Sequence, residues 1–235
     1  AVQSGLDEGA LEEAAKSALP PFAASMFRNA YEAWAYFGVV EALGPAKFYA
    51  VSSPDTEEVH AVPAEEVWAS SQATSPERRI PEAVFETKDG RVFAMKNEAA
   101  RELDYYGVKI ERRRDSSAGG NTAGLVGHRV LLLYRLDAVE DVAVTVDRQK
   151  RVQTPIDLLV EVLEPNDMGY PAYVSRFVER VNAARSRRPV QVVTFDESGE
   201  FPAGLLEDDS VVPIERRTVG FDEGKLADIA RLLND

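Results

Sequence analysis

Two carboxylates and a lysine are the most specific candidates for a catalytic site in this chain. Asp55 follows Pro54, and Glu86 and Lys88 come later, separated by one threonine. Two carboxylates could hold a divalent cation while the lysine steadies an attacking water, so the set could support metal-dependent cleavage of a phosphodiester. That reaction requires both carboxylates to meet at one cation. We instead expect Glu86 and Lys88 on one face of a hairpin strand, where solvated charges are common, and predict no metal there.

A glycine-rich segment suggests a second kind of chemistry, a phosphate cradle. Asp115–Gly127 contains Gly119 and Gly120, but no Lys-Ser or Lys-Thr pair follows, and the next segment has the apolar pattern of a strand. Phosphate cradles normally lead into the N-terminus of a helix. We therefore interpret the segment as a surface loop whose serine, asparagine and glycine content suits contact with a neighbouring molecule.

Nucleophiles and metal ligands are sparse in this sequence. The chain has no cysteine, and neither His60 nor His128 has a second nitrogen or thiolate ligand at local spacing. No Gly-x-Ser-x-Gly turn is present to carry a serine nucleophile. The acidic residues between Phe195 and Ser210 lack the spacing of a calcium-binding EF-hand loop and are interpreted as a solvated rim. We therefore predict no catalytic, cofactor-binding or metal-binding residues, and no cofactor.

The charge of the chain disfavours nucleic acid as a partner. The formal net charge is −13 over 235 residues, and the mean field of such a surface repels a phosphate backbone. Arginines occur in pairs and in one triplet, Arg112, Arg113 and Arg114. These clusters could grip an acidic partner if they converged in space, but we expect them to be scattered salt-bridge partners. The triplet is kept as a candidate for a protein interface.

The segment Phe22–Gly44 concentrates aromatic residues at helical spacing. Its apolar residues recur at steps of three and four, and Gly44-Pro45 ends the pattern. Because aromatic side chains carry a large apolar area, this helix must be buried against the fold or against another molecule. We expect burial in the core first and contact with a partner second. The interface candidates are Phe22, Phe27, Tyr31, Trp34 and Phe37, together with Gly119 and Gly120 of the glycine-rich loop.

Strands dominate the middle of the chain. The Asp89-Gly90 pair between two apolar segments predicts a hairpin over Ala83–Met95 with a type I′ turn. The apolar run Val130–Leu136 predicts a strand in the centre of the sheet, covered on both faces. Pro155–Glu164 fits both a helix and a strand, with a slight preference for strand. Further predicted elements are strands at Lys47–Val51, Tyr106–Arg112 and Val142–Val146 and a helical turn at Pro63–Ser70.

The C-terminal part alternates helices with strands. A helix over Pro171–Arg185 carries one apolar stripe, and Asp222 is predicted to cap a final helix. Strands are expected at Val190–Phe195 and Ser210–Ile214. The whole pattern predicts an α+β fold with a mixed or antiparallel sheet and flanking helices. We expect a helical N-terminal arm (residues 1–45) before an α+β domain (residues 46–235), or one continuous domain.

The missing catalytic residues favour a non-enzymatic structural or assembly subunit of a larger complex, such as a virus or phage particle. Its partners would be copies of itself or other protein subunits. Two alternatives stay open: a metal-dependent nuclease using Asp55, Glu86 and Lys88, and a module that binds a ligand or nucleic acid. No signal peptide or membrane span is predicted, so we expect a soluble protein in the cytoplasm or within a particle.

Overall fold

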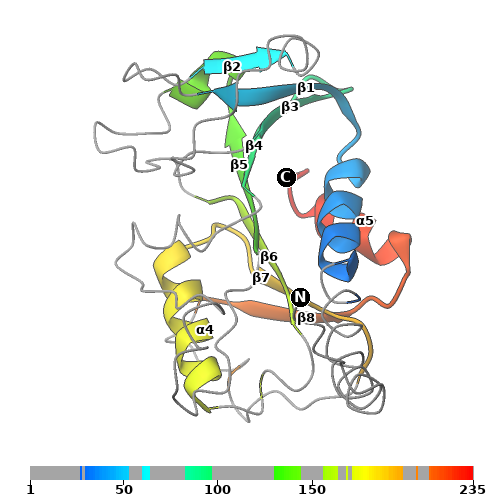
Figure 1. Cartoon of the computed structure of the whole chain (residues 1–235), viewed down its shortest axis with the longest axis vertical. Helices are drawn as coiled ribbons and strands as arrows, with labels where there is room; N and C mark the ends of the chain where they lie inside the picture. Colours follow the sequence, from blue (N-terminus) through cyan, green and yellow to red (C-terminus); the bar gives the residue numbers. More distant parts are fainter. Residues whose placement is uncertain are drawn as a thin grey trace, which may run out of the picture.

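In the part of the chain that the structure describes, an eight-stranded sheet carries helices on both faces (Figure 1). The computed structural model describes residues 27, 30–52, 60–63, 83–96, 130–143, 156–163, 168, 171–197, 205 and 212–234. The architecture confirms the predicted α+β class and the mixed sheet with flanking helices. No helix in these ranges is long and apolar enough to cross a membrane.

The strands lie in the order β2-β1-β3-β4-β5-β6-β7-β8 across the sheet. Neighbours from β2 to β6 are antiparallel, whereas β6, β7 and β8 are parallel. Helix α4 makes the crossover from β6 to β7 that a parallel pair requires. The bounds are β1 Pro45–Ser52, β2 His60–Pro63, β3 Ala83–Thr87, β4 Val92–Lys96, β5 Val130–Leu136, the 3-10 helix η3 Val139–Ala143, β6 Leu158–Val162, α4 Pro171–Ala184, β7 Val190–Thr194, β8 Ile214–Thr218 and α5 Glu223–Arg231.

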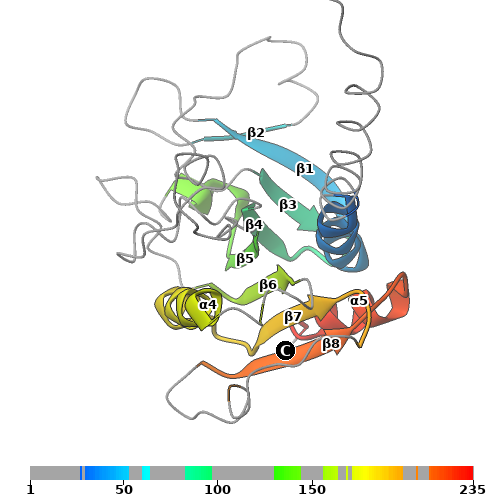
Figure 2. The same cartoon turned by 60° about the horizontal axis from the view of Figure 1, so that its bottom comes forward.

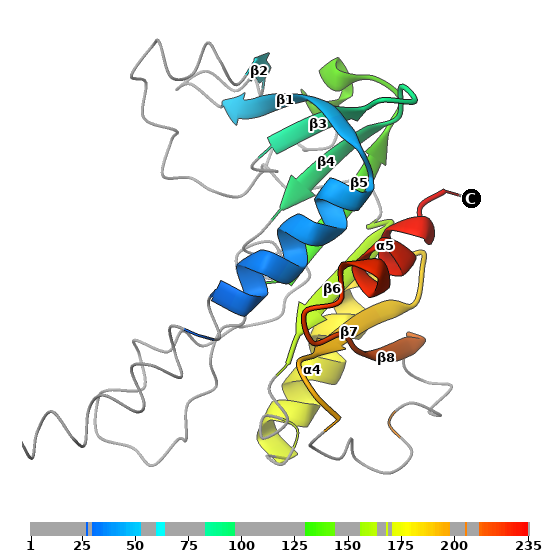
Figure 3. The ribbon, with the colours of Figure 1, turned by 90° about the vertical axis from the view of Figure 1, so that its right-hand side faces the viewer.

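Alternate residues of the strands contribute to two cores, one on each face of the sheet. On β5, Leu132 and Tyr134 pack on the side of α4, and Leu131 and Leu133 pack on the opposite side. That opposite side is covered by the helix over residues 30–42 and by α5 (Figures 2 and 3). Burial on both faces explains the uninterrupted apolar run of β5 and confirms its central position.

The helix over residues 30–42 belongs to the same core as the sheet. Its buried side includes Tyr31, Tyr36 and Val39. The hydroxyl oxygen of Tyr36 accepts a hydrogen bond from the Val162 backbone N–H on β6 at 3.2 Å. The part of the proposed N-terminal arm that the structure describes is therefore built into the fold, while the division of the chain at residue 45 stays a prediction.

The β3–β4 hairpin forms where it was predicted, but its turn is of a different type. The Gly90 N–H donates to the Thr87 carbonyl at 2.9 Å, and the Thr87 N–H donates to the Arg91 carbonyl at 2.8 Å. Gly90 has φ of +82°, but Asp89 is not among the described residues with positive φ. A type I′ turn would need positive φ at both central residues, so the prediction was wrong in type. The loop has the form of a type I turn followed by a left-handed glycine.

The ambiguous segment at residues 155–164 contains the strand β6, as the sequence slightly favoured. Asp157, which directly precedes β6, ties this segment to β5. Its carboxylate accepts the Arg135 backbone N–H at 2.6 Å, and its own N–H donates to the Leu133 carbonyl at 2.9 Å. Pairing with β5 on one side and β7 on the other therefore makes this segment a strand and not a helix.

Three elements differ from the sequence-based predictions. Val142 lies in the 3-10 helix η3, not in a strand, because the Asp141 carboxylate accepts the Ala138 N–H at 2.8 Å and holds the chain in a turn. Strand β8 begins at Ile214, where the predicted strand ended. Strand β2, which pairs with the outer edge of β1, was not predicted. The predicted helical turn after Pro63, the strand Tyr106–Arg112 and the loop Asp115–Gly127 lie outside the described residues.

Candidate protein interaction surface

Among the described residues, five aromatic rings from three segments gather on one side of the molecule. Tyr31 and Phe195 form the base of this cluster, with their ring centroids 5.3 Å apart. The ring of Phe221 lies 5.2 Å from Phe195 and 5.3 Å from Trp34, edge to face in both pairs. Phe27 lies 5.4 Å from Phe195 and 6.5 Å from Phe221. These separations and angles are favourable for aromatic pairs, so the rings form one packed cluster.

Local structure explains why these rings meet. Phe27, Tyr31 and Trp34 follow one another at steps of four and three, which places them along one flank of a helix. Phe195 and Phe221 follow β7 and β8, which are parallel neighbours whose carboxyl ends lie at the same edge of the sheet. A turn with Gly220 at φ of +57° precedes Phe221.

Tyr31 anchors the cluster to the sheet. Its hydroxyl donates to the backbone carbonyl of Thr194 at 3.4 Å, and its side chain is buried. Burial raises the pKa of the Tyr31 hydroxyl well above its ordinary value, and the negative charge of Asp196 raises it further. The phenol is therefore neutral at physiological pH and acts as a hydrogen-bond donor, not as a base.

Two rings of the cluster are open to solvent. Phe27 is 48% exposed and Phe221 is 63% exposed, although both pack on the buried Tyr31 and the partly buried Phe195. We call Phe27, Trp34 and Phe221 the aromatic surface. A contiguous group of exposed aromatic rings on a rigid base is typical of a binding surface.

Acidic residues border the aromatic surface. Phe195 and Phe221 are each followed by Asp-Glu, which gives two Phe-Asp-Glu segments side by side: Phe195–Glu197 and Phe221–Glu223. All four carboxylate residues are exposed. This arrangement was not predicted, although the repeated Phe-Asp-Glu is visible in the sequence, because parallel pairing of β7 with β8 is needed to bring the two segments together.

The predicted interface residues are distributed unevenly. Phe27, Tyr31 and Trp34 belong to the cluster, with Tyr31 buried, Trp34 half-buried and Phe27 half exposed. Phe37, which is 55% exposed, lies on the outer side of the same helix. The remaining candidates, Phe22, Arg112, Arg113, Arg114, Gly119 and Gly120, lie outside the described residues.

The residues considered for a nuclease site are not arranged as expected. Glu86 is paired with Lys47 across β1 and β3 at 3.1 Å, and this contact raises the pKa of Lys47. Lys88 lies in the hairpin loop beyond the end of β3. The prediction that Lys88 shares a strand face with Glu86 was therefore wrong. Its backbone N–H donates to the Gly44 carbonyl at 2.9 Å. Asp55 lies outside the described residues.

Buried ionisable side chains lie on the α4 side of the sheet and were not predicted. Lys96 and Glu161 are fully buried at the carboxyl ends of β4 and β6. The register places Glu161 opposite Val192, which in turn lies opposite Arg216.

Within the described ranges, no three histidine, aspartate or glutamate side chains lie close enough to hold a metal ion. Comparisons with family models, curated proteins and solved structures gave no match.

Proposed function

We propose that this protein is a non-enzymatic subunit of a larger protein complex and that it binds its neighbour through the aromatic surface. The observation that carries the proposal is the exposure of Phe27 and Phe221, whose rings pack on the buried Tyr31 and the partly buried Phe195. Leaving such rings in water forgoes the free energy of burying their apolar area. A partner that covers them would recover that free energy.

The base of the surface favours tight binding because it is already ordered. Tyr31 is held by its hydrogen bond to Thr194 and by contacts with Phe195 and Trp34. Side chains fixed before binding lose little conformational entropy when a partner arrives. Aromatic residues in such positions often contribute most of the binding free energy of an interface.

The metal-dependent nuclease is less favoured by the arrangement of its residues. The carboxylate of Glu86 is engaged by Lys47, and Lys88 lies in a loop beside the end of the 30–42 helix. A hydrolytic site would need Glu86 to leave this ion pair and meet a second carboxylate at one cation.

Photo-crosslinking in the cells that make the protein tests the proposal. We expect a photoreactive phenylalanine at position 221 to give a discrete protein adduct, and the same group at position 48 to give none. Phe48 is the matched control because it is also an exposed aromatic residue, at 42%, but lies on β1 outside the aromatic surface. In extracts, the unmodified chain should migrate well above its mass of 25.8 kDa, and Phe221→Ser should reduce that size. A free monomer without adducts would contradict the proposal.

A further inference from the structure

We propose that the aromatic surface binds a basic, partly apolar segment of a different protein, not a second copy of this chain. This inference rests on the proposed function and specifies the chemistry of the partner.

Four carboxylates border the aromatic surface. Asp196 and Glu197 follow the ring of Phe195, and Asp222 and Glu223 follow the ring of Phe221. The two rings lie 5.2 Å apart, so the two Phe-Asp-Glu segments meet at their phenylalanine rings. Asp222 also caps α5 by accepting the Gly224 N–H at 2.9 Å, which fixes the position of its carboxylate.

Among the described residues, Lys225 and Arg216 each donate to a backbone carbonyl beside these acidic residues. Lys225 donates from Nζ to the Thr218 carbonyl at 2.7 Å. Arg216 donates from Nη2 to the Glu197 carbonyl at 3.2 Å. The carboxylates outnumber these cations, and the chain as a whole carries −13, so the local field attracts positive charge.

A second copy that bound through its own aromatic surface would meet this surface with the wrong charge. A twofold contact places the same surface on both sides. The two Phe-Asp-Glu segments of one copy would then face the same two segments of the other copy. Like charges brought together in this way cost several kcal/mol and slow association. A partner with arginine or lysine avoids that cost.

The aromatic rings specify the rest of the partner. Arginine and lysine side chains are attracted to aromatic faces, and their aliphatic stems cover apolar area. An amphipathic helix with basic residues beside leucine or phenylalanine would place cations on the carboxylates and apolar groups on Phe27 and Phe221. Its burial of both rings would also satisfy the proposed function.

Titration of the purified protein with three synthetic peptides tests this inference. One is a basic amphipathic helix, the second has every basic residue replaced by glutamate, and the third keeps the basic residues but has serine at every apolar position. We expect the first to bind at least about 10-fold more tightly than the other two, and its affinity to fall about 10-fold between about 50 mM and 500 mM salt.

Variants locate the binding site. Phe221→Ser should weaken binding of the basic peptide about 10-fold. The double change Asp196→Asn with Glu197→Gln should weaken it by a similar factor. Glu140→Gln, which removes an exposed carboxylate on η3, should leave affinity unchanged and controls for the general effect of net charge. Circular dichroism of each variant would verify that it is folded.

The outcomes separate this inference from the proposed function. Equal binding of the basic peptide by the wild type and Phe221→Ser, or equal binding of the glutamate peptide, would overturn the inference. A crosslinked dimer of this chain at position 221, with no binding of the basic peptide, would overturn it while leaving the assembly function intact. A basic protein crosslinked at position 221 would support both.

Discussion

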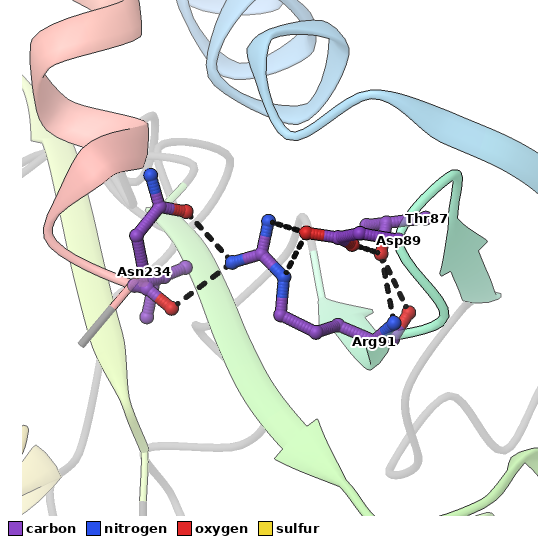
Figure 4. Close-up of polar contacts among 5 residues, drawn as sticks. Thr87, Asp89, Arg91 and Asn234 are labelled. Atoms are coloured by element: carbon purple, nitrogen blue, oxygen red, sulfur yellow. Dashed lines mark hydrogen bonds and ion pairs between the residues drawn. The ribbon is translucent and has the colours of Figure 1, made fainter.

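Arg91, immediately before β4, donates from Nη1 to the side-chain oxygen of Asn234 at 2.7 Å, joining the hairpin to the chain beyond α5 (Figure 4). The same nitrogen donates to the Leu233 carbonyl at 3.2 Å. The other side of the guanidinium is held by Asp89, with Nε and Nη2 each 2.9 Å from its Oδ2. Arg91 therefore links two segments that are far apart in the sequence and fixes α5 against the sheet.

Arg91→Ala should lower the free energy of unfolding by about 1–3 kcal/mol, since hydrogen bonds of a charged group are lost on both sides of the guanidinium. Arg231→Ala is the matched control, because Arg231 forms one exposed pair with Asp228 on α5. That change should cost about 0–0.5 kcal/mol. Urea unfolding measures both values. Similar losses for the two variants would contradict the linking role of Arg91.

Asp89 should make stability depend on pH in the acidic range. The hydrogen bond from Arg91, followed by that from the Thr87 hydroxyl, lowers the pKa of Asp89 from 3.8 to about 2. A lowered pKa means that the folded state favours the charged carboxylate, so this contribution is complete above about pH 4 and is lost as pH falls through about 2. Carbon-13 NMR of the carboxylate should give the lowered pKa directly. A midpoint near 3.8, or unchanged pH dependence in Asp89→Asn, would refute the assignment.

Tyr36 should contribute more than Trp34 to the free energy of unfolding. This differs from the expectation that the aromatic face of this helix is buried throughout. Tyr36 is 1% exposed, whereas Trp34 is half-buried at the aromatic surface. Tyr36→Ala should cost about 3–5 kcal/mol and Trp34→Ala less than about 2 kcal/mol. Tyr36→Phe should cost about 1–3 kcal/mol, because the buried Val162 N–H loses its acceptor. Equal losses in the two alanine variants would be inconsistent with this packing.

Elements determined by local pattern were predictable from the sequence. The apolar run of β5, the stripe of α4 and the cap at Asp222 each depend on neighbouring residues, and all three are present. Val142 was misassigned because alternation of valines favours a strand, whereas the local hydrogen bond from Ala138 to Asp141 decides the conformation. The turn type at Gly90 depended on one extra loop residue, which the Asp-Gly pair does not specify.

The candidate surface could be predicted only in part. Helical spacing identified Phe27, Tyr31 and Trp34, but it did not show which ring is buried. Phe195 and Phe221 entered the cluster through the parallel pairing of β7 and β8, a contact between segments distant in the sequence. The same pairing turned scattered acidic residues into a border around the rings.

Gly38 should resist substitution because the 30–42 helix and α5 approach closely there. A Cβ at residue 38 would lie 2.4 Å from Cδ1 of Leu226, a side chain that is fully buried. Overpacking of this kind costs about 1–3 kcal/mol, offset in part by the better helix propensity of alanine, about 0.5–1 kcal/mol. Gly38→Ala should therefore be neutral or destabilising in the wild type. With Leu226→Ala, which opens space at the same contact, the added methyl should become stabilising. A double-mutant cycle by urea unfolding should give a coupling above about 0.5 kcal/mol, and additive effects would mean that the two helices separate more easily than this packing implies.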